Sequence, residues 1–223
     1  MWILKSSNVM RAVMSIVIFF ALLCIPQAVN AESNDDGFTI STINDSIFQR
    51  MKGKSFADNC ATKREDLRHL CVLHYDFNGN VAKGELVCNK AIAQDLIDIF
   101  RELYKAKYQI ARMRLIDEYN ADDETSMRDN NTSCFNYRKV AGTKTVSKHG
   151  RGMAIDINPL NNPCVKVASG RVQPATGKQF VNRSKAFAHK IDKTDLCYKL
   201  FIKHGFRWGG AWRSTKDYQH FEK

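Results

Sequence analysis

The sequence predicts an α+β fold, with an antiparallel sheet and helices packed on one side of it. Residues 70–88 have the composition of two strands joined by a tight turn. Residues 89–107 and 194–204 repeat apolar side chains at three- and four-residue steps, which is the period of an amphipathic helix. We expect residues 206–221 to return to the sheet.

The first 31 residues have the pattern of a secretory signal peptide. Lys5 and Arg11 precede an uncharged apolar run at 12–25, and the small residues Val29 and Ala31 suit cleavage. An uncleaved membrane anchor is the alternative, but the apolar run is short for a span. We therefore expect export, with no stable membrane span after cleavage.

The cleaved chain is expected to hold an N-terminal extension at 32–69 and one folded domain at 70–223. Lipidation at Cys24 is a second alternative for the leader, but Leu23 is larger than the residue that normally precedes a lipidated cysteine. Residues 32–223 carry 32 basic and 23 acidic side chains, a net charge of +9. Such a charge suits an anionic partner, either the cell wall or nucleic acid. The sequence contains no nucleic-acid-binding motif, so we expect no nucleic acid.

Six cysteines remain after cleavage, and an even number in an exported chain permits disulfides. Buried free thiols are an equally good interpretation for several of them. None of the six has the C-x-x-C spacing of a zinc knuckle or a redox motif. They are Cys60, Cys71, Cys88, Cys134, Cys164 and Cys197.

The predicted hairpin is followed by a helix and a further strand. His74 lies within the first strand of the hairpin, and we interpret it as a packed core histidine. Asn89 is the predicted N-cap of the first helix. Residues 111–119 alternate in part and predict the next strand, and the polar residues 120–146 predict a long loop of the kind that borders substrate sites.

The segment 147–159 holds the first half of a predicted metal site. Two glycines after His149 argue against a helix, so we expect a loop carrying His149 and then a strand from Met153. Asp156 would be an acid within an apolar strand, with Ala154 on the same face. A buried carboxylate is costly unless it is paired or bound to a metal.

The second half of the site is predicted near the C-terminus. His220 is a second imidazole, and Asp217 precedes it by three residues. Two histidines and one carboxylate form a common catalytic zinc set, with the fourth position left to water. Asp217 is the additional acid, which can accept a proton from that water.

These residues resemble the zinc D-alanyl-D-alanine carboxypeptidase family, which also contains L-alanyl-D-glutamate endopeptidases. The resemblance covers roughly residues 85–223, and the pairing of two motifs makes it specific. The motifs are Ser147-x-His149-x-x-Gly152-x-Ala154-x-Asp156, Trp208-Gly-Gly-x-Trp212 and Asp217-x-x-His220-Phe221.

The resemblance implies one zinc ion in a fold of the Hedgehog/DD-peptidase type. It implies His149, Asp156 and His220 as zinc ligands and Asp217 as the general base. Arg138 is similar in position to the family's substrate-binding arginine, and a guanidinium can hold a carboxylate or stabilise an oxyanion. Ser147 is expected to hydrogen-bond the substrate, with capping of its own loop as the alternative. Other arginines rival Arg138, namely Arg128 and Arg151.

We therefore predict a monomeric zinc metallopeptidase that acts on peptidoglycan or muropeptides in the periplasm or cell envelope of a bacterium. Cleavage of D-alanyl-D-alanine is favoured over cleavage of L-alanyl-D-glutamate by the family label alone. One departure is Ala211, where this branch of the family carries an acid. Loss of that acid favours the alternative of a catalytically weak cell-wall-binding protein. A Hedgehog-type signalling domain is a more remote alternative.

Overall fold

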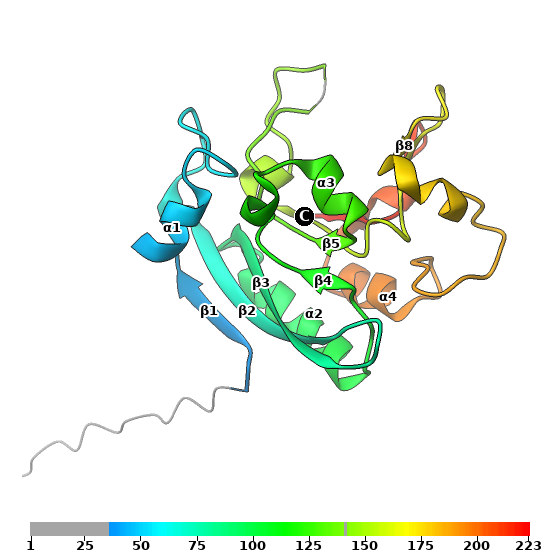
Figure 1. Ribbon diagram of the computed structural model, residues 1–223, viewed down its shortest axis with the longest axis horizontal. Coiled ribbons are helices and arrows are strands. Elements are labelled where there is room, and N and C mark those ends of the chain that lie inside the picture. The colour runs from blue at the N-terminus through cyan, green and yellow to red at the C-terminus, as the bar shows by residue number, and fades with distance from the viewer. Residues whose placement is uncertain (1–35, 141) are drawn as a thin grey trace, which may run out of the picture. The chain divides into compact units, whose positions relative to one another are not determined.

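The computed structural model describes residues 36–140 and 142–223, whose elements are arranged as in Figure 1. The predicted signal peptide at 1–31 and the lipidation alternative at Cys24 lie outside these residues. The strands of the described chain form four small sheets, in the orders β1-β2-β3, β10-β7-β8, β6-β11-β9 and β4-β5. The combination of helices with antiparallel sheets agrees with the α+β class. The strands are divided among several sheets rather than collected in one.

The elements are short, and α2 is the longest helix with 13 residues. None of the helices within residues 36–140 and 142–223 is long and apolar enough to cross a bilayer. The strands are β1 Thr39–Thr42, β2 Leu67–Tyr75, β3 Val81–Asn89, β4 Arg112–Met113, β5 Asn131–Thr132, β6 Ala154–Asp156, β7 Cys164–Lys166, β8 Val172–Gln173, β9 Arg207–Trp208, β10 Thr215–Asp217 and β11 His220–Glu222. The helices are α1 Asp45–Met51, α2 Ala93–Lys105, α3 Asp123–Arg128 and α4 Leu196–Lys203, with 3-10 turns η1 Arg64–Asp66, η2 Ile116–Tyr119, η3 His149–Arg151, η4 Ala175–Phe180 and η5 Gly209–Ala211.

The predicted hairpin at 70–88 is confirmed as the pair β2 and β3. These strands are antiparallel along their whole length, from Leu67 opposite Asn89 to Tyr75 opposite Val81. Strand β1 pairs with the other edge of β2, with Thr39 opposite Cys71. Residues of the predicted extension at 32–69 therefore take part in this sheet.

Helix α2 carries the apolar face that the sequence predicted, but it begins later than Asn89. Asn89 is still paired with Leu67 as the last residue of β3, and its side chain accepts a hydrogen bond from the amide of Ala91. The helix begins at Ala93 and ends at Lys105. The prediction of an Asn89 cap is wrong because asparagine also stabilises a turn through its own side chain.

The strand predicted at 111–119 is mostly wrong. Only Arg112 and Met113 are extended, as β4, and they pair in parallel with β5. The chain then forms η2, which ends at Asn120 in the left-handed conformation (φ 54°). Leu115 and Ile116 are both buried although they are adjacent, which a turn allows and the alternation of a half-buried strand does not.

The helix predicted at 194–204 is confirmed as α4, with Asp195 as its N-cap. Its buried Phe201 stacks on Phe221 of β11, with ring centroids 4.3 Å apart. Side chains of α2, β2, β3, β6 and β11 complete the same core. This core holds the strands that carry the predicted metal site.

The cysteines of the described chain are free thiols rather than disulfides. Cys88, Cys134, Cys164 and Cys197 are buried. Burial raises the pKa of the Cys88 and Cys134 thiols well above the usual value, so both are protonated at neutral pH. The sequence left disulfides and free thiols open, and the cysteines of the described residues are free thiols.

Candidate metal centre

The loop that carries His149 is fixed by Gly152. This glycine has φ +67°, and a Cβ atom there would lie 2.6 Å from the backbone nitrogen of Asn89. The carbonyl of Gly152 accepts a hydrogen bond from that same nitrogen at 2.9 Å. Only glycine allows both the left-handed backbone and this close approach to the end of β3. The loop prediction at 147–152 is confirmed, with His149 in the single turn η3.

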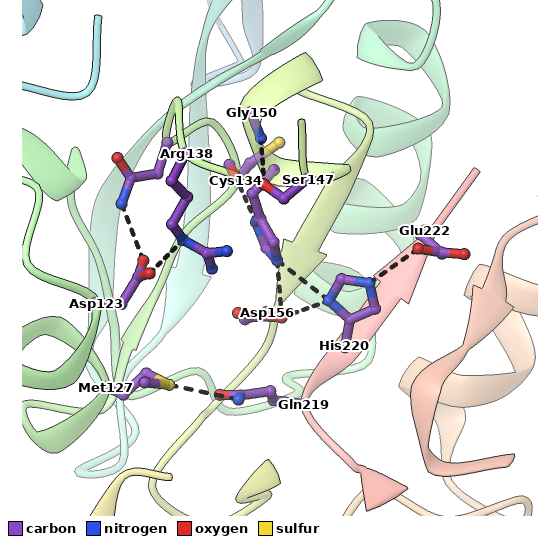
Figure 2. A network of polar contacts seen from close by, with 12 residues as sticks. Asp123, Met127, Cys134, Arg138, Ser147, Gly150, Asp156, Gln219, His220 and Glu222 are labelled. Atoms are coloured by element: carbon purple, nitrogen blue, oxygen red, sulfur yellow. Dashed lines mark hydrogen bonds and ion pairs between the residues drawn. The ribbon is translucent and has the colours of Figure 1, made fainter. Parts of the chain in front are cut away.

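Asp156 and His220 face each other across neighbouring antiparallel strands. They are direct partners in the register of β6 and β11. The Oδ1 atom of Asp156 lies 3.0 Å from Nδ1 of His220 and 3.3 Å from Nε2 of His149. The two imidazole nitrogens lie 3.1 Å apart, so three donor atoms converge from a loop and two strands (Figure 2).

The other nitrogen of each imidazole has an acceptor of its own. Nδ1 of His149 donates to the carbonyl of Cys134 at 2.7 Å. Nε2 of His220 lies 3.4 Å from Oε2 of Glu222. These partners leave His149 Nε2 and His220 Nδ1 to face the shared centre as electron-pair donors, the arrangement found around metal-binding histidines.

Glu222 was not among the residues predicted from the sequence. Its position two residues after His220 places both side chains on one face of β11. That spacing was the available signal, since an acid at i+2 in a strand can reach the outer nitrogen of a histidine.

The charges of the cluster favour a cation at its centre. All three side chains are buried, at 6–8 % exposure. Burial opposes ionisation of Asp156, but the neighbouring His149 and His220 outweigh it and hold the pKa of this carboxyl below its usual value. Burial likewise opposes protonation of His220, but its bonds to Asp156 and Glu222 raise its pKa to about 10. At neutral pH a proton therefore lies between His220 and Asp156, and a metal ion bound at the centre would take its place.

The donor set and spacing fit zinc. Two imidazoles and a carboxylate are common zinc ligands, with bonds of about 2.0–2.2 Å. Tetrahedral bonds of that length separate ligand atoms by roughly 3.3 Å, and the three separations here are 3.0, 3.1 and 3.3 Å. His149, Asp156 and His220 are also the residues of the described chain whose ligand atoms group as a possible metal site.

Asp217 lines the same cavity of about 380 Å³ as the cluster. Its Oδ1 atom is enclosed and has no hydrogen-bond partner among the described residues. Burial raises the pKa of Asp217 above its usual value, although the charge of His220 acts in the opposite direction. A carboxyl with a raised pKa and a free oxygen is suited to taking up and releasing protons.

The Trp-Gly-Gly motif shapes the wall beside Asp217. A Cβ atom on Gly209 would lie 2.8 Å from Cβ of Asp217 and 3.2 Å from Cβ of His220. A Cβ atom on Gly210 would lie 2.3 Å from the indole of Trp208. Gly209 therefore lets η5 pass close to Asp217 and His220, and Gly210 leaves room for the indole of Trp208.

Arg138 also lines the cavity, where it forms an ion pair with Asp123 of α3. The amide of Asn136 donates to the other oxygen of Asp123 at 2.9 Å, which fixes that carboxylate. Among the rivals predicted from the sequence, Arg151 is exposed outside this cavity and Arg128 lines a different one.

Ser147 caps its own loop, as the alternative interpretation of the sequence held. Its Oγ accepts a hydrogen bond from the amide of Gly150 at 2.9 Å. The residue is buried and lines the cavity. Its hydroxyl accepts a hydrogen bond but donates none within the described residues, so the hydroxyl proton is available to a ligand.

Ala211, the departure from the family pattern, is exposed at the end of η5. The neighbouring Trp212 lines the cavity, with its ring centroid 5.1 Å from that of His220. The cluster of three ligands is complete without an acid at position 211.

Residues 141–223 match the family model described as D-alanyl-D-alanine carboxypeptidase. The matched segment contains His149, Asp156, Asp217 and His220, and the match supports the family that the motifs predicted. No match was found among curated proteins or among solved structures.

Proposed function

From the family match over 141–223 and the geometry of the cluster, we propose that this protein is a zinc peptidase that cleaves peptidoglycan stem peptides. The match itself supports a peptidase of this family; the metal, the substrate and the bond cleaved are proposed. The observation that carries the proposal is the convergence of His149, Asp156 and His220 in one cavity with Asp217.

The three ligands would hold one zinc ion. Zinc bound there would polarise the scissile carbonyl and increase the acidity of a water molecule. His149 and His220 are oriented for this role by the Cys134 carbonyl and by Glu222. Asp156 supplies negative charge that the buried cluster otherwise lacks.

Asp217 would be the general base and then the general acid. Its unpaired Oδ1 accepts a proton from the attacking water, and the raised pKa of the carboxyl favours delivery of that proton to the leaving amine. Gly209 allows the close packing that places this carboxyl, because a side chain there would collide with the Cβ atom and the backbone carbonyl of Asp217.

Arg138 would hold a carboxylate of the substrate. Its guanidinium lines the cavity while Asp123 contacts the Nε edge, so the Nη groups remain available as a pair of donors. Peptidoglycan stems are rich in carboxylates, which also suits the basic charge of the chain. Ser147 would add one hydroxyl donor.

We favour D-alanyl-D-alanine carboxypeptidase activity over L-alanyl-D-glutamate cleavage, following the description of the matching family. We also propose the Hedgehog/DD-peptidase fold, export to the periplasm or cell envelope, and a monomeric state. Ala211 favours one further candidate, a zinc-dependent wall-binding protein with weak catalysis. Asp217, which such a protein would not need, argues against it.

The test is zinc content and muropeptide cleavage by residues 32–223, followed by mass spectrometry. We expect one zinc per chain and loss of one D-alanine; release of the stem after L-alanine would establish the endopeptidase instead. Asp217→Asn should keep zinc and lose activity, whereas His220→Ala should lose both. Arg213→Gln, at an exposed position outside the cavity, is the matched control. Zinc binding without any cleavage would refute the enzyme and favour the wall-binding candidate.

A further inference from the structure

A second cavity, of about 630 Å³, lies apart from the metal cluster. It shares no lining residue with the cavity of His149, Asp156 and His220. Its wall comes from the turn between β2 and β3, from β4, and from the chain that follows α3. Helix α3 borders both cavities, because Met127 lines the cavity of the metal cluster and Arg128 lines the second cavity. The volume is in the range of small-ligand sites, roughly 300–1,000 Å³.

Both carboxylates in this second cavity are already used within the protein. Asp129 accepts a hydrogen bond from the hydroxyl of Tyr119 at 2.6 Å and pairs with Arg112 at 3.1 Å. Asp76 accepts hydrogen bonds from the backbone amides of Asn78 and Asn80 at 2.9 and 2.8 Å. Arg112 neutralises Asp129, whereas the amides that hold Asp76 leave its negative charge in the cavity.

The cations outnumber these acids, and the side chains of two of them form no hydrogen bond or ion pair. The side chains of Lys83 and Arg128 make no hydrogen bond or ion pair within residues 36–140 and 142–223, although Arg128 lies near enough to Asp122 to help lower the pKa of that carboxyl. Arg114 has only a long contact, 3.7 Å, with Glu118. A single exposed cation is ordinarily a solvated surface charge, but several around a concavity create a focused positive potential.

A side-chain amide donor held in a fixed orientation in the same wall distinguishes this cavity from a basic surface. Asn130 accepts a hydrogen bond from the Leu160 amide through Oδ1, so its Nδ2 is the donor to Oδ1 of Asn161. Asn161 must therefore present Nδ2 as its free end, and this group has no partner within the described chain. Asn161 is only 7 % exposed. This Nδ2 group is not one of the fully enclosed side-chain atoms that lack a partner in the described chain, so solvent or a ligand in the cavity can reach it.

We infer that this second cavity binds an anionic group, a phosphate or a carboxylate, held by Lys83, Arg128 and the Nδ2 group of Asn161. Arginine offers two parallel donors to either anion, lysine adds a point charge, and the amide adds a directed hydrogen bond. The cavity is large enough for a sugar that carries such a group, and Phe77 supplies an apolar part of its wall. Binding at this site needs neither zinc nor peptidase activity.

The test is calorimetric titration of residues 32–223 at one fixed ionic strength. Glucose 6-phosphate and glucuronic acid are the two anionic probes, and glucose is the neutral probe. We expect saturable binding of at least one anion and none of glucose. Preference for one probe then identifies phosphate or carboxylate as the group recognised.

Three variants separate a built site from general charge. Lys83→Gln combined with Arg128→Gln should weaken the bound anion at least about tenfold, and Asn161→Leu should weaken it severalfold. Lys185→Gln combined with Lys203→Gln removes the same charge from exposed positions outside the cavity and should leave the affinity within about twofold. Equal weakening by both charge pairs, or no saturable binding of either anion to the wild type, would overturn the inference. Metal-free protein should bind the anion as well as zinc-loaded protein, so failure of the peptidase proposal leaves this test unaffected.

Discussion

Glu222 is expected to control how tightly the cluster would bind zinc, although it is not one of the three proposed ligands. Its Oε2 atom lies 3.4 Å from Nε2 of His220, and its other oxygen accepts from Arg207 at 2.8 Å. Removing an outer-shell partner of a metal-binding histidine typically costs about 10–100-fold in affinity. The hydrogen bond here is long, and the other oxygen of the same carboxylate binds Arg207, so we place the loss in Glu222→Ala at the lower end. A tenfold loss corresponds to about 1.4 kcal/mol.

The assay is competition for zinc with a chromophoric chelator, measured on wild type and variants. Glu222→Gln keeps an oxygen acceptor of the same shape and should lose less than Glu222→Ala. Arg207→Gln is the matched control, because Arg207 is 71 % exposed and its removal leaves the bond between Glu222 and His220 in place. If Glu222→Ala is folded and binds zinc as tightly as wild type, Glu222 does not position His220.

Three further changes test the scaffold. Gly152→Ala should lower the free energy of unfolding by at least about 1–2 kcal/mol, which is the cost of a left-handed non-glycine residue. The added Cβ atom also meets the Asn89 nitrogen, which increases this cost. Urea denaturation measures the change, and a variant as stable as wild type would contradict the prediction. Burial lowers the pKa of His74 below its usual value, so the stability contributed by its neutral form is full above about pH 6.5 and is lost as the pH falls. The melting temperature of His74→Leu should therefore fall less than that of wild type between pH 7 and 5. An equal fall in both proteins would exclude His74 as the source of this pH dependence. Arg183 donates to the carbonyl of Ile191 at 2.8 Å, and its guanidinium packs 4.4 Å from the centre of the Tyr218 ring. Arg183→Lys should therefore destabilise the fold by about 1–3 kcal/mol, measured by thermal unfolding. An unchanged midpoint would mean that these contacts contribute nothing to stability.

The sequence predicted that His149, Asp156 and His220 would converge, because their chemistry is unusual in its setting. Asp156 is an acid in an apolar strand, and glycines near His149 exclude a helix. The register of β6 and β11 then brings His220 directly opposite Asp156, as predicted. Local sequence signals were weaker for elements that depend on distant contacts. Strand β4 is short because β5, a segment well separated along the chain, determines where it can pair.

The roles of polar side chains were harder to predict than their presence. Asn89 is compatible with a helix cap, a turn and a strand end alike, and pairing with Leu67 decides between them. Ser147 satisfies its own loop, which is a local contact that substrate binding does not require. Glu222 was missed because the strand that aligns it with His220 contains only three residues. Such short strands are formed by tertiary contacts, and periodicity gives little warning of them.

Alternate residues of strands β6 and β11 face the hydrophobic core and the cluster of proposed metal ligands. Ile155 and Phe221 are direct partners and fully buried in the core, whereas Asp156 and His220 point to the opposite face. On that face the small Ala154 lies opposite Glu222, in the same register that pairs Asp156 with His220. A shift of one residue between these strands would exchange core and ligand faces completely. The packing of Phe221 on Phe201 therefore fixes the register on which the spacing of the metal ligands depends.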